Sequence, residues 1–433
     1  MSTGNDTTNG GDSQAAPTQS ELLTSYRDHL LGVFGAPQAV LVRGQGVHVW
    51  DADGNGLVDL LGGIAVNALG HAHPAWVKAV ADQAATLGHV SNFFTTPQQI
   101  GLAEKLLELA AAPDGSKVFF ANSGSEANEA AFKLARRSGH ENPGPNGPRT
   151  TVVAVDGAFH GRTMGSLALT AKKAYREPFE PLPGGVVHIA PTLESLEAVI
   201  DDSVSALIVE PIRGEQGVFA LPDGWLQRAR ELTREHGALL IVDEVQTGIG
   251  RTGEWFAYTA QLDAGELPDA ITLAKGLGAG FPVGALITFG DAVSQLLTAG
   301  QHGTTFGGNP LATAAGLATL ATIEHDDLLA NARSVGKVVT DGLTALERVQ
   351  EVRSHGLLIG FDLDDPRQDP DSAEPLGAAV VAAARAAGYI VNATGPTTIR
   401  LAPPLILTQA QAEDFLAVLP SILDRADAAL AAH

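Results

Sequence analysis

Cysteine is absent from the 433-residue sequence, and basic residues are scarce, with 27 Lys and Arg against 49 Asp and Glu. Without thiols the chain can form no disulfide, thiolate metal site or cysteine nucleophile, which excludes zinc fingers, iron–sulfur clusters and papain-like chemistry. The formal net charge of −22 disfavours nucleic acid and anionic membranes as partners, because both require an exposed basic patch.

The sequence also lacks long apolar runs. The longest candidate, residues 311–323, is interrupted by three Thr and one Gly, and it is shorter than the roughly 18 apolar residues that a membrane span needs. Residues 1–19 are polar and glycine-rich and have neither the basic start nor the apolar stretch of a secretory signal. We expect them to form a disordered tail, and we expect a cytoplasmic protein that does not contact a membrane.

The residues that are present predict a folded α/β protein. A hydrophobic share of 45% with 18% charged residues is typical of globular chains, and the length predicts two or three structural units. Five short apolar runs, each followed by helical periodicity, have the pattern of strands buried on both faces of a mostly parallel sheet. These runs are residues 117–122, 151–156, 206–210, 238–243 and 270–275. In such sheets ligands bind beyond the carboxyl ends of the strands.

Around these runs the pattern predicts further elements. An amphipathic helix follows Asn122, with an apolar face that excludes Asn128. The residues of that face are Ala127, Ala130, Ala131 and Leu134. Residues 139–148, rich in Pro and Gly, predict a loop. Residues 47–60 predict a hairpin, and the C-terminal part predicts Ala/Leu-rich helices with strands near 352–363 and 389–401.

Three motifs that suggest other functions are better explained structurally. Residues 51–56 begin like a calcium loop, but Gly62 stands where the bidentate acid is required, so a hairpin turn is favoured. Residues 248–253 fit a dinucleotide-binding glycine pattern, yet no helical period follows. His71 and His73 lack a third ligand nearby and are expected to pack or cap around a helix start, so no metal is expected.

Other signals point to a single chemistry. Residues 122–126 are mostly small and connect a strand to a helix. The free backbone N–H groups at such a helix start can bind a phosphate, and we call this segment the phosphate seat. A capping box of Ser123 with Glu126 also explains the pattern. Asp243 ends a buried strand, where a charge is costly unless a cation answers it, although a helix cap or a buried hydrogen bond also explains it. Lys275 ends the next run and precedes a glycine-rich stretch. A phosphate seat, an acid and a lysine at one sheet edge are the groups that pyridoxal phosphate needs.

Several longer motifs resemble the class III pyridoxal-phosphate aminotransferases, and the similarity covers nearly everything after about Ser20. The motifs are residues 63–71, 119–136, 158–163, 243–253, 273–285 and 302–310. The resemblance implies a fold-type-I pyridoxal-phosphate transferase, with a large mostly parallel-sheet domain over 76–318. A smaller α+β domain would be built from both chain ends, residues 20–75 and 319–433. Residues 63–71 and 119–136 favour the branch of the class that acts on N2-acetylornithine over the ornithine branch.

The resemblance also implies roles for cofactor-binding residues. Lys275 would be the Schiff-base lysine, Asp243 the partner of the pyridine nitrogen, and Gln246 the donor to the phenolic oxygen of the cofactor. Phe159 and Val245 would contact the two ring faces. Three residues would hold the phosphate, the last from the neighbouring subunit of a homodimer: Gly124, Ser125 and Thr305.

For the substrates, N-acetylornithine and 2-oxoglutarate, the resemblance implies that Arg162 binds the α-carboxylate with Thr304 nearby. Glu215 would pair with Arg400 while the amine reacts and then move aside, so that Arg400 can bind a carboxylate of 2-oxoglutarate. Two departures from the usual pattern are Arg213, where many relatives carry Gln, and a Pro/Gly-rich insertion near Pro143.

Alternatives remain open at this point. Succinylornithine, succinyldiaminopimelate, ornithine or 4-aminobutyrate could be the amino donor. An aminomutase would use the same lysine for an isomerisation. A binding or structural protein could keep the fold without the chemistry, although the presence of Lys275, Asp243 and the phosphate seat argues against it.

Overall fold

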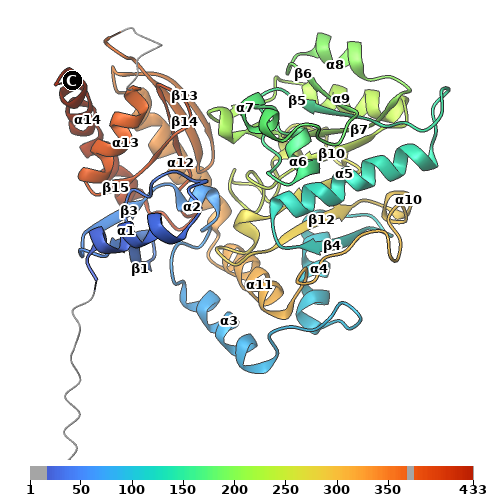
Figure 1. Cartoon of the computed structure of the whole chain (residues 1–433), viewed down its shortest axis with the longest axis horizontal. Helices are drawn as coiled ribbons and strands as arrows, with labels where there is room; N and C mark the ends of the chain where they lie inside the picture. The colour runs from blue at the N-terminus through green and yellow to red at the C-terminus, as the bar shows by residue number, and fades with distance from the viewer. Residues whose placement is uncertain (1–16, 368–374, 433) are drawn as a thin grey trace, which may run out of the picture.

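The computed structural model describes residues 17–367 and 375–432, and its chain forms two units joined side by side (Figure 1). Residues 1–16 of the expected tail lie outside the described residues. Thr18 is already the N-cap of helix α1 (Gln19–His29), and its side chain accepts a hydrogen bond from the backbone of Glu21. The helix therefore begins within the range expected for the tail.

The large unit is built on a seven-stranded sheet with the order β4-β12-β11-β10-β7-β5-β6. Only β12 runs antiparallel to its two neighbours, so the sheet is mostly parallel, as predicted. β6 and β12 are additions to the predicted strands. The strands are β4 (Lys117–Ala121), β5 (Thr151–Val155), β6 (Val186–Ile189), β7 (Val204–Val209), β10 (Leu239–Asp243), β11 (Ala270–Leu273) and β12 (Gly284–Thr288).

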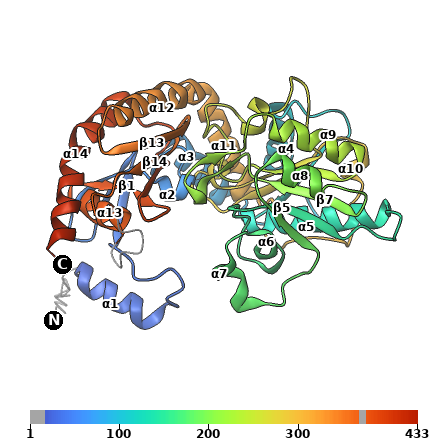
Figure 2. The ribbon, with the colours of Figure 1, turned by 90° about the horizontal axis from the view of Figure 1, so that it is seen from above.

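Both faces of this sheet are covered by helices, which explains the continuous apolar runs (Figure 2). Alternate residues of each strand point to opposite faces. Ile241 packs in the cluster beneath α5 (Gly124–Glu141), whereas Leu240 and Val242 pack in the cluster that includes Trp225 of α9 (Trp225–Glu235). The remaining helices of this unit are α4 (Pro97–Leu109), α6 (Met164–Leu169), α7 (Lys173–Arg176), α8 (Leu193–Val199) and α10 (Asp291–Ser294).

Helix α5 confirms the predicted apolar face, since Ala127, Ala130, Ala131 and Leu134 are all buried. Two expectations for this region were wrong. Asn128 is also buried, because the helix lies on the sheet at the level where strand ends present polar partners. The helix continues to Glu141, so the loop is shorter than the predicted range of residues 139–148. Position 139 of the helix requires glycine, because a Cβ there would lie 1.9 Å from Arg149 O.

The smaller unit contains strands from both chain ends. The predicted hairpin is confirmed by the antiparallel pair β2 (His48–Asp51) and β3 (Gly56–Asp59), and β3 pairs with β15 (Tyr389–Ile390). A second sheet has the order β13-β14-β17-β16. Its strands are β13 (Val349–His355), β14 (Leu358–Leu363), β16 (Asn392–Ala393) and β17 (Thr398–Leu401). The exact domain boundaries stay a prediction.

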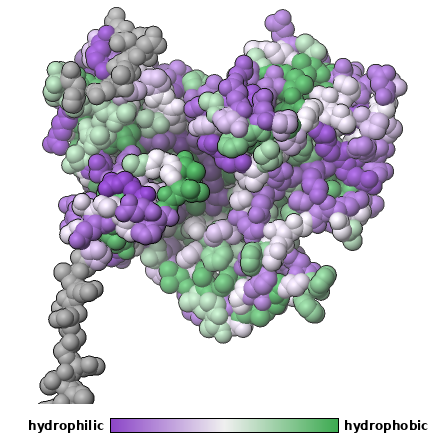
Figure 3. All heavy atoms as spheres, in the orientation of Figure 1, coloured by the Kyte–Doolittle hydropathy of each residue, from purple (hydrophilic) through white to green (hydrophobic). Residues whose placement is uncertain are grey.

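Helices cover these smaller sheets and the junction between the units (Figures 1 and 2). Other elements are β1 (Leu41–Gln45), α2 (Gly62–Ala65), α3 (Pro74–Thr86), α11 (Pro310–His325), α12 (Leu328–Thr344), α13 (Leu376–Ala386) and α14 (Gln409–Ala431). Within residues 17–367 and 375–432, no helix combines the length and the apolar character needed to cross a membrane. The surface is hollowed between the two units (Figure 3).

Candidate active site

A cavity of about 390 Å³ lies at the carboxyl edge of the large sheet, within the size range of small-molecule sites. Its walls come from the segments that follow β4, β5, β7, β10 and β11, as expected for a parallel sheet. Seven predicted site residues line it together: Gly124, Ser125, Phe159, Asp243, Val245, Gln246 and Lys275.

Lys275 lies one residue beyond the Ala274 that follows β11, and its backbone φ is 37°. This left-handed region is unfavourable for a residue with a Cβ, and such strain occurs mainly at functional positions. Burial lowers the pKa of the Lys275 amine, and the positive charge of Arg400 lowers it further. Nearby carboxylates raise this pKa, but they do not outweigh the lowering. An amine with a lowered pKa is more often unprotonated and can therefore act as a nucleophile or a base.

Asp243 ends β10 and is buried at the floor of the cavity. Its Oδ2 accepts a hydrogen bond from Asn128 Nδ2 at 2.7 Å and lies 2.7 Å from His160 Nδ1, while Oδ1 accepts from the Val245 backbone at 3.0 Å. These contacts supply the partners that a buried carboxylate requires. They also fix its orientation toward the cavity.

Asn128 and His160 are site residues that the sequence reasoning missed. Asn128 Oδ1 accepts from Thr272 Oγ1 at 2.9 Å, so helix α5 is tied to β11 through this amide. Burial opposes protonation of His160, but the hydrogen bond and charge of Asp243 outweigh it and raise the pKa of the imidazole. Asn128 could have been identified as a polar residue directly beside the apolar face of the predicted helix. His160 could have been identified from its position within the motif at residues 158–163.

Glu210 is a further buried carboxylate on the cavity wall, directly after β7. Burial raises its pKa to about 7, and the Asp243 charge adds to this effect against the attraction of His160. Its Oε2 accepts a hydrogen bond from the Phe159 backbone at 2.9 Å. Glu210 therefore holds the segment that places the Phe159 ring on the cavity wall.

The beginning of α5 forms the phosphate-seat candidate. The first helical N–H groups have no helical acceptors, and at Gly124 a Cβ would lie 2.8 Å from Val245 Cγ1. The capping alternative is half correct: Ser123 Oγ accepts from the Glu126 backbone at 3.1 Å, but the Glu126 carboxylate accepts from the Asn122 backbone at 2.8 Å instead of closing the box. Capping and a free helix end facing the cavity thus coexist.

Glu215 and Arg400 form an ion pair beside Gln246, with Arg400 Nη1 2.6 Å from Glu215 Oε1. Gln246 Nε2 donates to the same carboxylate oxygen at 3.3 Å. Burial opposes ionisation of Glu215, but Arg400 and Lys275 outweigh it and lower the pKa of this carboxyl. The Arg400 side chain is only 1% exposed, whereas that of Glu215 is 36% exposed, so the acid is the partner with room to move.

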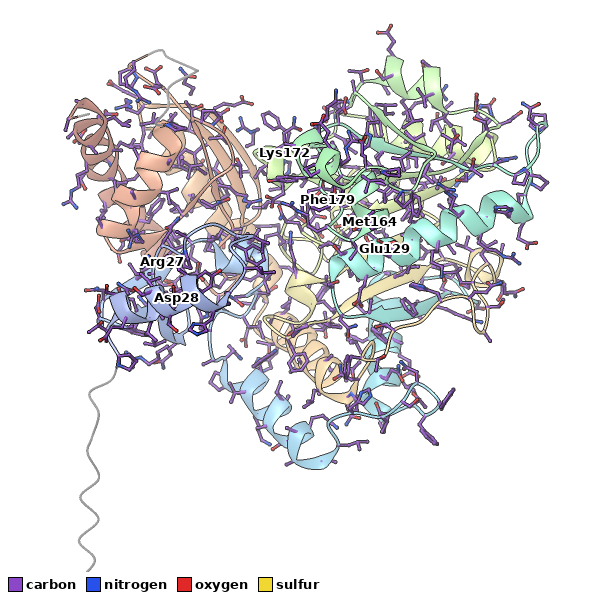
Figure 4. All side chains as sticks on the ribbon, viewed as in Figure 1. Arg27, Asp28, Glu129, Met164, Lys172 and Phe179 are labelled. Carbon is purple, nitrogen blue, oxygen red and sulfur yellow. The ribbon has the colours of Figure 1, made fainter. Side chains whose placement is uncertain are left out.

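Five predicted site residues lie outside the cavity lining: Glu215 and Arg400, described above, and Arg162, Thr304 and Thr305. Arg162 is exposed, and its guanidinium carbon lies 3.6 Å from the ring centre of Tyr175. Thr304 Oγ1 accepts from Asn122 Nδ2 at 2.9 Å, next to the cavity, whereas Thr305 is exposed. The loop of Arg162 is held from α5, because Glu129 accepts from the Gly165 backbone at 2.7 Å where α6 begins (Figure 4).

The cavity residues fit pyridoxal phosphate. A helix N-terminus without room for a side chain suits a phosphate, a buried acid suits a protonated pyridine nitrogen, and a buried amine with a lowered pKa suits an aldehyde. Aromatic Phe159 and aliphatic Val245 supply apolar surface for a flat ring. Among the described residues, no group of three or more His, Asp or Glu is placed to hold a metal ion.

Comparisons with known proteins identify the family of this chain. The aminotransferase class-III family matches residues 34–423. An acetylornithine aminotransferase of Mycolicibacterium smegmatis is 50% identical over 400 residues, which cover 92% of this chain and 96% of that protein. One of Streptomyces coelicolor is 49% identical over 94% of this chain and 97% of its own length.

Solved structures show the same fold. The acetylornithine aminotransferase of Elizabethkingia anophelis superposes with a TM-score of 0.81 at 31% identity, covering 94% of this chain and 99% of that one. The ornithine aminotransferase of Toxoplasma gondii gives 0.84 at 30% identity, over 95% of this chain and 96% of its own. The fold and site are those of a pyridoxal-phosphate-dependent aminotransferase. The chain belongs to the class III aminotransferases, which confirms the predicted fold class, enzyme type and cofactor.

Proposed function

We propose that this enzyme transfers the δ-amino group of N2-acetylornithine to 2-oxoglutarate, giving N-acetylglutamate 5-semialdehyde and glutamate, a reaction of arginine biosynthesis. The observation that carries the proposal is the Glu215–Arg400 ion pair next to Lys275, because it can present either a neutral or a cationic wall to a substrate. The relatives that are about half identical over most of the chain bear the corresponding name.

Seven residues of one chain would hold the cofactor, with Lys275 as its covalent partner and Asp243 at the ring nitrogen. The others are Gly124, Ser125, Phe159, Val245 and Gln246. When bound, the cofactor supplies an electron sink for the carbon that loses a proton. Asn128 and His160 keep Asp243 oriented, as their 2.7 Å contacts indicate.

Lys275 would move the proton. Its Nζ would take a proton from the substrate carbon that bears nitrogen and would later donate it to the cofactor side of that nitrogen. One residue would thus serve as base and then as acid. The lowered pKa of this amine suits both roles, because it reduces the difference between accepting a proton and releasing one at physiological pH.

The ion pair would distinguish the two substrates. With Glu215 on Arg400, the wall is neutral and does not repel the ammonium group of the donor. When Glu215 turns away, Arg400 offers a bidentate cation to a carboxylate of 2-oxoglutarate. Arg162 would bind the α-carboxylate of N-acetylornithine near Thr304, which requires its side chain to leave Tyr175.

The proposal includes a homodimer in the cytoplasm, in which Thr305 of one subunit completes the phosphate site of the other. Thr305 is exposed in the single chain and lies in a glycine-rich loop, which supports a role at an interface. Phe93 and Phe306 are also exposed, at 94% and 58%, and apolar surface of this kind favours burial against a second copy.

A donor panel tests the proposed reaction. The purified holoenzyme is incubated with 2-oxoglutarate and, in turn, N-acetylornithine, succinylornithine, succinyldiaminopimelate, ornithine and 4-aminobutyrate, and glutamate is measured. N-acetylornithine should give the highest kcat/KM. A higher value for another donor would reassign the substrate, and isomerisation of a donor without glutamate formation would identify an aminomutase instead.

A further inference from the structure

Glu215 lies in a short turn between β8 (Ile212–Arg213) and β9 (Phe219–Ala220). The turn contains the 3-10 helix Gly214–Gln216, and Val218 has a φ of 66°, which is unusual for a β-branched residue. A conformation of this kind persists only where surrounding contacts hold it. The contacts that hold the turn therefore affect the Glu215–Arg400 pair, which we call the substrate gate.

Arg353 of β13 provides one such contact. Its Nε donates to the Gly217 carbonyl at 2.8 Å, two residues after Glu215. Its guanidinium also stacks over the Phe219 ring, with the carbon 4.1 Å from the ring centre. The side chain is 9% exposed, so these contacts are little weakened by solvent.

The orientation of Arg353 is fixed by Asp362 of β14 through two hydrogen bonds of 2.7 and 2.9 Å. Thr398 Oγ1 of β17 donates to the same carboxylate at 2.6 Å, and Asp362 and Thr398 are paired in the sheet register. Two residues further along β17 is Arg400, the partner of Glu215. The contacts thus form a closed ring that links the backbone near Glu215 to the strand that carries Arg400.

The turn also packs directly on this sheet and is held from its other side. Gly360, which is paired with Arg400, has no room for a side chain, because a Cβ would lie 2.3 Å from the Gly217 carbonyl. Arg213 Nη1 donates to Gln216 Oε1 at 2.8 Å and to the Asp156 carbonyl at 3.0 Å, which ties the turn to the large unit. The backbone on either side of the gate residue is therefore anchored.

We propose that Arg353 is a positioning residue for the substrate gate. Arg353 holds the backbone of the turn stationary, so that the gate closes and opens by rotation of the Glu215 side chain toward Arg400 and away from it. This inference rests on the proposed function for the identity of the two substrates. Loss of the anchor weakens the closed pair and enlarges the fraction of enzyme with Arg400 free. A ligand that needs free Arg400 then binds more tightly, in proportion to that fraction.

The test compares two ligands of the holoenzyme. Glutarate, an unreactive dicarboxylate, reports on free Arg400 through its Kd from calorimetric titration, and the KM of N-acetylornithine reports on the closed pair. For Arg353→Gln we expect glutarate to bind about five- to tenfold more tightly and the donor KM to rise by a similar factor, because exposed Arg400 repels the donor ammonium. Arg353→Lys, which keeps a charged donor, should restore part of both values.

Arg348→Gln is the matched control. Arg348 precedes β13 and makes the same kind of paired contact, with Asp427 at 2.5 and 3.3 Å, but it does not touch the turn. The Arg348→Gln variant should leave the glutarate Kd and the donor KM within about twofold of the wild type, as expected for a site away from the gate. If Arg353→Gln does not fold, Asp362→Asn carries the test with the same expected signs.

Two results would overturn the proposal and leave Arg353 with a purely structural role. The first is that the glutarate Kd and the donor KM move in the same direction in Arg353→Gln. The second is that both constants equal those of Arg348→Gln. The glutarate titration needs no turnover. It therefore remains decisive even if the donor panel assigns a different amine, in which case that amine replaces N-acetylornithine in the KM measurement.

Discussion

His160 Nδ1 lies 2.7 Å from Asp243 Oδ2, and the two side chains are 0% and 2% exposed. A buried carboxylate is costly unless hydrogen bonds and an opposite charge compensate it. The raised pKa of His160 shows that the pair favours a charged imidazole. The contact thereby holds the Asp243 carboxyl group in place at the cavity floor, where a cationic ring nitrogen would need it.

Asp243→Asn should keep the fold and lose most activity. The amide has nearly the same shape but cannot hold a proton on a ring nitrogen by charge, and preorganised electrostatic groups contribute about 10²–10³-fold to kcat. Steady-state kinetics of the purified holoenzyme, with circular dichroism as a check of folding, measures the effect. A kcat within threefold of the wild type would contradict the role of Asp243.

Asn128→Ala should have a smaller effect on the same step. It removes a charge-assisted hydrogen bond to Asp243, which corresponds to a loss of about tenfold in kcat. Asn142→Ala is the control at the C-cap of the same helix, where the Asn142 side chain donates to the Ser138 carbonyl at 3.3 Å, away from Asp243. Equal kcat values for the two variants would show that Asn128 does not act through Asp243.

Glu244→Gln should change how stability depends on pH. Burial raises the pKa of Glu244 from 4.5 to about 7, so the folded protein retains a proton there that the unfolded chain releases. The stabilisation by this proton is complete below pH 4.5 and is lost as pH rises to about 7, by at most about 3 kcal/mol.

The neutral Gln variant lacks this loss, and it can still accept the bond from the Tyr258 backbone that Glu244 accepts at 2.8 Å. Thermal unfolding of both proteins between pH 5 and 8 should show the variant gaining relative to the wild type as pH rises. Since Glu210 titrates in both proteins, it does not affect this difference. Parallel curves would be inconsistent with a protonated Glu244.

Glu215→Ala should convert the gate to a permanently open state. Arg400 then lacks its ion-pair partner, although Asn392 Oδ1 still accepts from it at 2.8 Å. We expect the KM for N-acetylornithine to rise about tenfold or more, while 2-oxoglutarate binds at least as tightly as before. Separate measurement of the two half-reactions gives both values, and an equal loss in both would exclude a gating role.

Much of the fold could be predicted because the strands of the large sheet are buried on both faces and therefore appear as short apolar runs. Strand β12 was missed since Gly284 to Thr288 follow a glycine-rich stretch without a clear boundary. Asn128 was placed wrongly because helical periodicity identifies a face but not the polar strand ends beneath it. Lys275 and Asp243 could be predicted as site residues because each lies at or just beyond a strand end, where ligands bind.

Relations between distant segments could not be predicted from local patterns. The contact of Arg353 with the Gly217 carbonyl joins residues 136 positions apart. A homodimer would also add residues to the site that one chain does not show, which is why Thr305 stays a prediction.

The most direct test of the account is the identity of the lysine that binds the cofactor. The holoenzyme is reduced with borohydride, digested and mapped by mass spectrometry. We predict that the cofactor mass is found on the peptide that contains Lys275, and that Lys275→Ala loses both this label and the visible absorbance of the bound cofactor. A label on any other lysine would contradict the assignment on which the proposed mechanism is built.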